Sequence, residues 1–243
     1  MRITAFILTV GFCLSSAQPA DAGFKAVLQN TSSNFDGTTI SGYVGRIDWK
    51  QNNATDVPWI SHAFSSFCIE RDANIYFGRA YNFQTKTLGS SPVPGTGMGT
   101  ASANDIRRLW SNQINQLGVT DSSGTHREKN AAFQIAIWRI LDNTFFTNSM
   151  YLAQSANVKN LANSYYNGRT NGTLANLVAL TSGTAPGSVN FQDQIVEVKS
   201  GYYVDGKGEV QPTPAPAAIL LAIFGCGSFL GLRRLMRSPV SPI

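Results

Sequence analysis

Apolar and polar positions alternate in several short stretches near the start of the chain, and again near its end. Alternation of this kind, rich in aromatic and β-branched residues, predicts β-strands with one buried face. The predicted strands are Phe24–Leu28, Ile40–Trp49, Phe64–Glu70, Ile75–Tyr81 and Ile195–Val198. Gly89–Thr100, which is dense in glycine and proline, follows the fourth strand and is predicted to be a loop.

The middle of the chain follows a helical period instead. The predicted helices are Ala101–Gln116, Lys129–Leu141 and Tyr151–Tyr166. Strands first, helices in the middle and a strand at the end predict an α+β domain. We place this domain at residues 23–210, because no second boundary precedes the prolines that follow it.

The first 22 residues do not fit this domain. A lone charge, Arg2, precedes the apolar run Ile3–Leu14, and small residues lead to the cleavage pattern Ala20-Asp21-Ala22. This layout is typical of a secretory signal peptide, so we expect the protein to be exported. The alternative is a buried N-terminal helix.

The other end, residues 211–243, is also a separate segment. A proline-rich spacer containing Pro214-Ala215-Pro216 leads into an apolar stretch at residues 217–232, and the basic residues that follow include Arg233 and Arg234. Proline makes such a spacer stiff and extended. The stretch is slightly shorter than the roughly 17–25 residues of a permanent spanning helix, and the arginines behind it favour the cytoplasmic side of a membrane.

This tail resembles the PEP-CTERM class of sorting signals, in which a Pro-Glu-Pro motif, an apolar helix and a basic cluster follow one another. Ala215 stands where that class has Glu. The resemblance implies anchoring in the membrane through the C-terminal helix, cleavage near the motif by a dedicated membrane protease, and a final location at the cell surface or outside the cell. A plain C-terminal membrane anchor is the alternative.

Charge and histidine content exclude several classes of function. Four of the 19 basic residues and one of the 14 acidic residues lie in the terminal segments, so the central region has a net charge near +2. It carries no basic stripe, and we expect no nucleic-acid partner. The two histidines, His62 and His126, have no cysteine or carboxylate at metal-ligand spacing, and we expect no metal or cofactor.

The central region holds one cysteine, Cys68, because the other two lie in the terminal segments. Such a cysteine is a buried hydrophobe, a partner for another chain, or a reactive group. Gln134 is the one polar residue in the run Ala131–Trp138. A buried amide without partners costs roughly 1–3 kcal/mol, so Gln134 needs a hydrogen-bonded backbone edge or a chemical role.

The chemical role would be an internal thioester. A cysteine thiolate held against a carboxamide can attack its carbonyl carbon and expel ammonia. Fixed orientation supplies most of the drive for this reaction. On this interpretation the bond joins Cys68 Sγ to Gln134 Cδ.

Two segments that hold these residues resemble the signature segments of bacterial thioester domains. They are Phe67-Cys68-Ile69-Glu70 and Phe133-Gln134-Ile135-Ala136-Ile137-Trp138. The resemblance gives Cys68 the thiol role and Gln134 the acyl role, with Phe67, Glu70, Ala136 and Trp138 as supporting residues. Phe133 stands where the well-studied members have Thr.

This resemblance covers about residues 40–200 and implies a β-barrel-like antiparallel sheet with an inserted helical part. It also implies a single covalent attachment, through Gln134, to an amine or hydroxyl on a surface or matrix target. With one turnover per molecule the protein would not be an enzyme. The alternatives are a non-reactive extracellular matrix protein with a buried Cys68, and a Cys68–His126 hydrolase, for which no local signature exists.

Overall fold

A computed structural model describes most of the central region. The described residues are 24–28, 35–38, 44–52, 57–71, 75–76, 78–92, 96–182 and 191–213. The expected signal peptide, the motif at residues 214–216, the apolar stretch at residues 217–232 and Arg233 and Arg234 lie outside them. Among the described residues, no helix combines the length and the apolarity needed to span a membrane.

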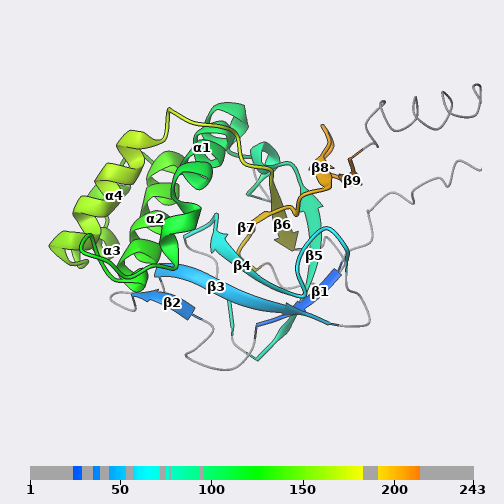
Figure 1. The fold of residues 1–243 in the computed structure, drawn as a ribbon, viewed down its shortest axis with the longest axis horizontal. Helices are drawn as coiled ribbons and strands as arrows, with labels where there is room; N and C mark the ends of the chain where they lie inside the picture. Colours follow the sequence, from blue (N-terminus) through cyan, green and yellow to red (C-terminus); the bar gives the residue numbers. More distant parts are fainter. Residues whose placement is uncertain are drawn as a thin grey trace, which may run out of the picture.

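An antiparallel sheet of seven strands closes into a barrel (Figure 1). The strand order is β1 (Phe24–Val27), β5 (Ala80–Lys86), β6 (Leu177–Ser182), β7 (Gln194–Glu197), β4 (Ala63–Cys68), β3 (Val44–Gln51) and β2 (Phe35–Thr38). Because β1 also pairs with β3, six strands form the barrel and β2 is left on its edge. The barrel-like sheet expected from the sequence is confirmed.

Aromatic side chains fill the barrel. Trp49 of β3 stacks on Phe64 of β4, with ring centroids 6.3 Å apart, and meets Phe83 of β5 edge-on at 5.1 Å. Phe24 and Phe191 pack against Phe83 from two further positions. Offset and edge-on contacts of this kind add to the free energy gained by burial, so these rings make the interior a packed core.

The helices form one insertion between β5 and β6. They are α1 (Gly99–Leu117), α2 (His126–Leu141), α3 (Ser149–Leu152) and α4 (Ala156–Gly168), with short 3-10 turns at Leu88–Ser90 and Phe145–Thr147. In Figure 1 they gather on one side of the barrel. Helix α2 contacts α1, α4, β2 and β3, and every residue from 129 to 138 is buried. It is therefore the central element of the α+β fold.

Several element boundaries differ from the prediction. The predicted strand Ile75–Tyr81 is wrong over most of its length: Tyr81 Oη accepts a hydrogen bond from the Tyr76 N–H and donates one to its carbonyl, which closes a loop before β5 begins at Ala80. The predicted helix Tyr151–Tyr166 is two helices, because the backbone of Ser155 is not helical and its side chain caps α4 by accepting from the Val158 N–H.

The sequence also failed to reveal four strands. β6 is an apolar run buried along its described length, so it shows no alternation. β2, β8 (Tyr202–Val204) and β9 (Val210–Pro212) are only three or four residues long. β8 and β9 pair as a separate hairpin.

A capping box sets the start of α2. Thr125 Oγ1 accepts from the Glu128 N–H at 3.2 Å, and Glu128 Oε2 accepts from the Thr125 N–H at 3.0 Å. The helix therefore starts at His126, three residues before the predicted Lys129, and ends at the predicted Leu141.

Thr125→Ala should lower the free energy of unfolding by about 1 kcal/mol, because the helix loses its side-chain cap. Denaturant unfolding of the full chain measures this loss. Thr125→Ser keeps the acceptor oxygen and should stay close to wild type. Equal losses in both variants would contradict the capping role.

Candidate functional site

Cys68 and Gln194 face each other across two neighbouring strands. Cys68 ends β4, Gln194 begins β7, and the two are paired in the ladder. One step further the Ile69 N–H donates to the Asp193 carbonyl at 2.8 Å. That pattern marks Cys68–Gln194 as a non-hydrogen-bonded pair, in which opposite Cα atoms approach to about 4.5 Å. Their side chains share one face of the sheet at its closest spacing.

The thiol of Cys68 lies against the carboxamide of Gln194. Sγ is 3.5 Å from Nε2 and 3.8 Å from Oε1. Because Cδ is bonded to both of these atoms, Sγ is within about 4 Å of the carbonyl carbon, near the ~3–3.5 Å of a near-attack arrangement. Cys68 is 4% exposed and Gln194 is fully buried.

Three contacts hold the Gln194 carboxamide in one orientation. Nε2 donates to the carbonyl oxygens of Gln192 and Asp193, at 3.1 and 3.2 Å. Oε1 accepts from Ser66 Oγ at 2.7 Å. Since carbonyl oxygens accept and never donate, the nitrogen belongs on their side, and the oxygen faces the Ser66 hydroxyl.

The side chain of Gln134 contacts the backbone of the same cysteine. Its Oε1 accepts from the Cys68 N–H at 2.7 Å, and its Nε2 donates to the Cys68 carbonyl at 2.8 Å. This is the backbone-edge alternative left open by the sequence. The pairing of β3 with β4 ends at Ile47–Ser66, so the amide of Gln134 takes the place of the next ladder position.

Burial keeps the Cys68 thiol protonated. It raises the pKa of Cys68 from 9.0 to about 12; the hydrogen bond from Gln194 opposes this shift, and the nearby charge of Glu70 adds to it. The site therefore holds a neutral thiol at physiological pH, in contact with the carboxamide of Gln194.

Apolar packing fixes the residues around the two segments. Phe67 lies 4.7 Å from Phe133 and 5.7 Å from Trp110, measured between ring centroids. Phe133 thus packs directly on the residue before Cys68. Ala136 is fully buried, and Trp138 packs edge-on against Phe145 further along α2.

Glu70 joins the end of β4 to the segment before β7. Its carboxylate accepts from the Asp193 N–H at 2.9 Å, and its carbonyl accepts from the Gln192 side chain. The buried Asp193 also accepts from Ser91 Oγ at 2.6 Å. These bonds hold β7 in register with β4, which is what brings Gln194 to Cys68.

The sequence prediction missed Gln194, Ser66 and Asp193 as members of this site. Gln194 borders the predicted strand Ile195–Val198, but the polar Gln192 and Asp193 precede it, so it lacked the apolar surroundings that singled out Gln134. His126, in contrast, begins α2 eight residues before Gln134, about 12 Å along the helix axis. The structure does not bring it to Cys68.

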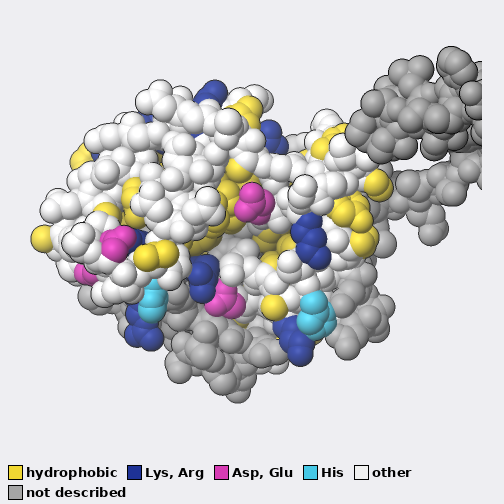
Figure 2. Space-filling view, viewed as in Figure 1, with side chains coloured by type: hydrophobic (Ala, Val, Ile, Leu, Met, Phe, Trp, Pro, Cys, Tyr) yellow, Lys and Arg dark blue, Asp and Glu magenta, His cyan; other side chains and the backbone are white. Residues whose placement is uncertain are grey.

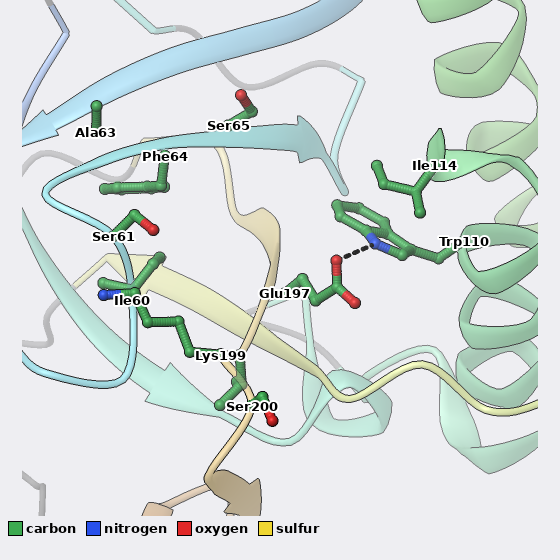
Figure 3. Close-up of a pocket in the computed structure, with 11 residues that line it drawn as sticks. Ile60, Ser61, Ala63, Phe64, Ser65, Trp110, Ile114, Glu197, Lys199 and Ser200 are labelled. Atoms are coloured by element: carbon green, nitrogen blue, oxygen red, sulfur yellow. Dashed lines mark hydrogen bonds between the residues drawn. The ribbon is translucent and has the colours of Figure 1, made fainter. Parts of the chain in front are cut away.

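A separate groove opens where β4 and β7 diverge beyond their last pair. Its volume is about 460 Å³. Trp110 and Ile114 of α1 form one wall, and Glu197 Oε2 accepts from Trp110 Nε1 at 3.1 Å (Figure 3). In the space-filling view hydrophobic side chains show in a hollow near the middle of this face, while Lys and Arg side chains are scattered singly (Figure 2). Neither Cys68 nor Gln194 lines the groove.

No protein-family model matches this chain, and no curated protein matches it. The solved structures that resemble it include the following two. The N-terminal thioester domain of a surface protein from Clostridium perfringens is 14% identical, with 73% of this chain and 99% of that one covered and a TM-score of 0.46. The pilus-presented adhesin Spy0125 (Cpa) is 10% identical, with 72% and 46% covered and a TM-score of 0.45. This chain spans about half of the adhesin chain.

Gln134→Ala should lower the free energy of unfolding by about 3 kcal/mol, because it leaves the buried N–H and carbonyl of Cys68 without their side-chain partners. Denaturant unfolding measures the change. Gln116→Ala, at an exposed site near the end of α1, is the matched control and should stay within about 0.5 kcal/mol of wild type. Similar losses in both would contradict the role of Gln134.

Cys68 should stay a thiol up to about pH 10 in Gln194→Ala, a variant that lacks the facing carboxamide. Burial favours the neutral form, so the folded chain holds this proton more tightly than the unfolded chain. The stabilisation that the folded chain gains from the protonated Cys68 thiol is complete below the ordinary pKa of 9.0 and is lost as the pH rises towards 12. The ultraviolet thiolate absorbance of this variant, minus that of the Cys68→Ala/Gln194→Ala double variant, measures the titration. A midpoint near 9.0 would contradict it.

Proposed function

We propose that this chain is an exported surface protein that forms an internal thioester between Cys68 Sγ and Gln194 Cδ and uses it once, to attach covalently to a target. The contact of Sγ with both heteroatoms of one carboxamide, at 3.5 and 3.8 Å, is the observation that carries the proposal. It favours Gln194 over Gln134 as the acyl residue, because the amide of Gln134 is engaged with the backbone of Cys68.

Closure of the thioester needs no group from outside the site. The Sγ–Cδ bond forms, the Cδ–Nε2 bond breaks, and the thiol proton moves to the leaving nitrogen, which departs as ammonia. Orientation drives the step, since a fixed pair of groups reacts as if at very high concentration. Burial of both residues then keeps water from the bond.

Attachment reverses the roles of the atoms. An amine or hydroxyl of the target attacks Cδ, a new amide or ester bond forms, and Sγ leaves as a thiol that takes up the proton of the nucleophile. The target is then bound through Gln194. Each molecule reacts once, so we do not regard the protein as an enzyme. The proposed target is a nucleophile on a cell surface or in an extracellular matrix.

The second candidate is a non-reactive extracellular structural protein of the same fold. The observation that favours it is the buried, protonated state of Cys68, whose pKa is raised to about 12. Buried cysteines with raised pKa values are generally inert. The two candidates differ in the covalent state of Cys68.

Intact-mass spectrometry of the full chain, prepared without reductant, tests the proposal. The mass of the wild type should be lower than the mass calculated from its sequence by one ammonia. Methylamine should add at Gln194, because a primary amine opens a thioester. Cys68→Ala and Gln194→Ala should show neither change. Gln134→Ala, where it remains folded, should still lose ammonia, since its acyl residue is intact.

Fragment spectra assign the bond to one glutamine. Methylamine found on Gln134 would show that Gln134 is the acyl residue, as the sequence predicted, and would overturn the assignment of Gln194. A full-mass wild type with an ordinary Cys68 thiol would support the non-reactive candidate.

A further inference from the structure

Ser66 places a hydroxyl on the oxygen of the Gln194 carboxamide. It lies two residues before Cys68 on β4, so both side chains point to the same face of the strand. Ser66 is fully buried, and its Oγ donates to Gln194 Oε1 at 2.7 Å. Any negative charge that develops on this oxygen therefore forms beside a hydrogen-bond donor that is already in place.

Trp49 fixes the direction of that hydrogen bond. Its Nε1 donates to Ser66 Oγ at 2.7 Å from the neighbouring strand β3. An indole N–H only donates, so it occupies a lone pair of the serine oxygen. The hydroxyl proton is then directed to Oε1, which only accepts. The result is a one-way chain from Trp49 through Ser66 to Gln194.

We propose that Ser66 is the oxyanion donor of the Cys68–Gln194 thioester chemistry, and that Trp49 orients its hydroxyl. This inference rests on the proposed function. When Sγ bonds to Cδ, the electron pair of the C=O bond moves onto Oε1, and the hydrogen bond from Ser66 strengthens as the charge grows. The pair returns as the Cδ–Nε2 bond breaks and ammonia leaves with the thiol proton.

The same donor serves the attachment step. When a target amine attacks Cδ of the thioester, the charge again develops on Oε1, which remains the carbonyl oxygen throughout. Because the donor acts on both transition states, its loss should slow closure and opening by similar factors. A donor placed in advance in a water-excluded site is worth up to about 10²–10³ in rate.

The chain offers a matched control in the next residue. Ser65 points to the opposite face of β4, where its exposed hydroxyl donates to Asp48 at 2.6 Å. Ser65→Ala removes the same group from the same strand without touching the carboxamide. Ser66→Thr keeps the hydroxyl in the site and tests for rescue.

The test measures two rates on the full chain by intact mass. Excess ammonia opens the thioester and restores the thiol and the carboxamide; removal of the ammonia then starts closure, which is followed as mass loss. In a second reaction, methylamine labels the closed form. Ser66→Ala should slow both reactions at least about tenfold, whereas Ser65→Ala and Ser66→Thr should stay close to wild type. Trp49→Phe should give a smaller slowing of both.

The outcomes separate the inference from the proposed function. If the wild type never loses ammonia, the proposed function fails and the inference falls with it. If the wild type closes and Ser66→Ala closes at the same rate, only the inference is overturned. Faster labelling or hydrolysis in Ser66→Ala would mean that the change only loosened the packing, and would also overturn it. If Ser66→Ala does not fold, unchanged rates of closure and labelling in Trp49→Phe would overturn the inference.

Discussion

The end of β4 depends on two hydrogen bonds from a helix. Strand β3 stops pairing with β4 at Ser66, so the buried N–H and carbonyl of Cys68 would lack partners on that side. The Gln134 amide supplies one acceptor and one donor, at 2.7 and 2.8 Å. The bonds join the helical insertion to the barrel, and leave the Cys68 side chain to face Gln194 on the other strand.

Burial and proximity have opposite effects on the Cys68–Gln194 pair. A pKa of about 12 makes the Cys68 thiolate cost roughly 7 kcal/mol at pH 7, at about 1.4 kcal/mol per pKa unit. Holding thiol and carboxamide in a near-attack arrangement lowers a barrier by about 7–11 kcal/mol. In the proposed chemistry, proximity of the two groups would therefore work against the cost of deprotonating the thiol, and the Ser66 hydroxyl would act on the charge that develops on Gln194 Oε1.

The sequence singled out Cys68 and the buried Gln134, but not Gln194, whose carboxamide faces the Cys68 sulfur. Cys68 was evident as the lone cysteine of the central region, and Gln134 as the polar residue in an apolar helix. Which carboxamide meets the sulfur depends on the register of β4 with β7, two strands whose facing residues are 126 positions apart. That register rests on contacts of Glu70 and Asp193 that no local pattern records.

The burial of Cys68 and Gln194 also limits how a target could reach them. Cys68 is 4% exposed and Gln194 is fully buried, so in the proposed function a nucleophile would reach the thioester only when this end of the barrel opens. The proposed thioester would react with an amine or with a hydroxyl, so its own chemistry would not single out one target. Selection must then come from the surface that holds the target while the site opens. In this proposal the covalent chemistry would take place in the barrel interior, and the choice of target would depend on the surface around it.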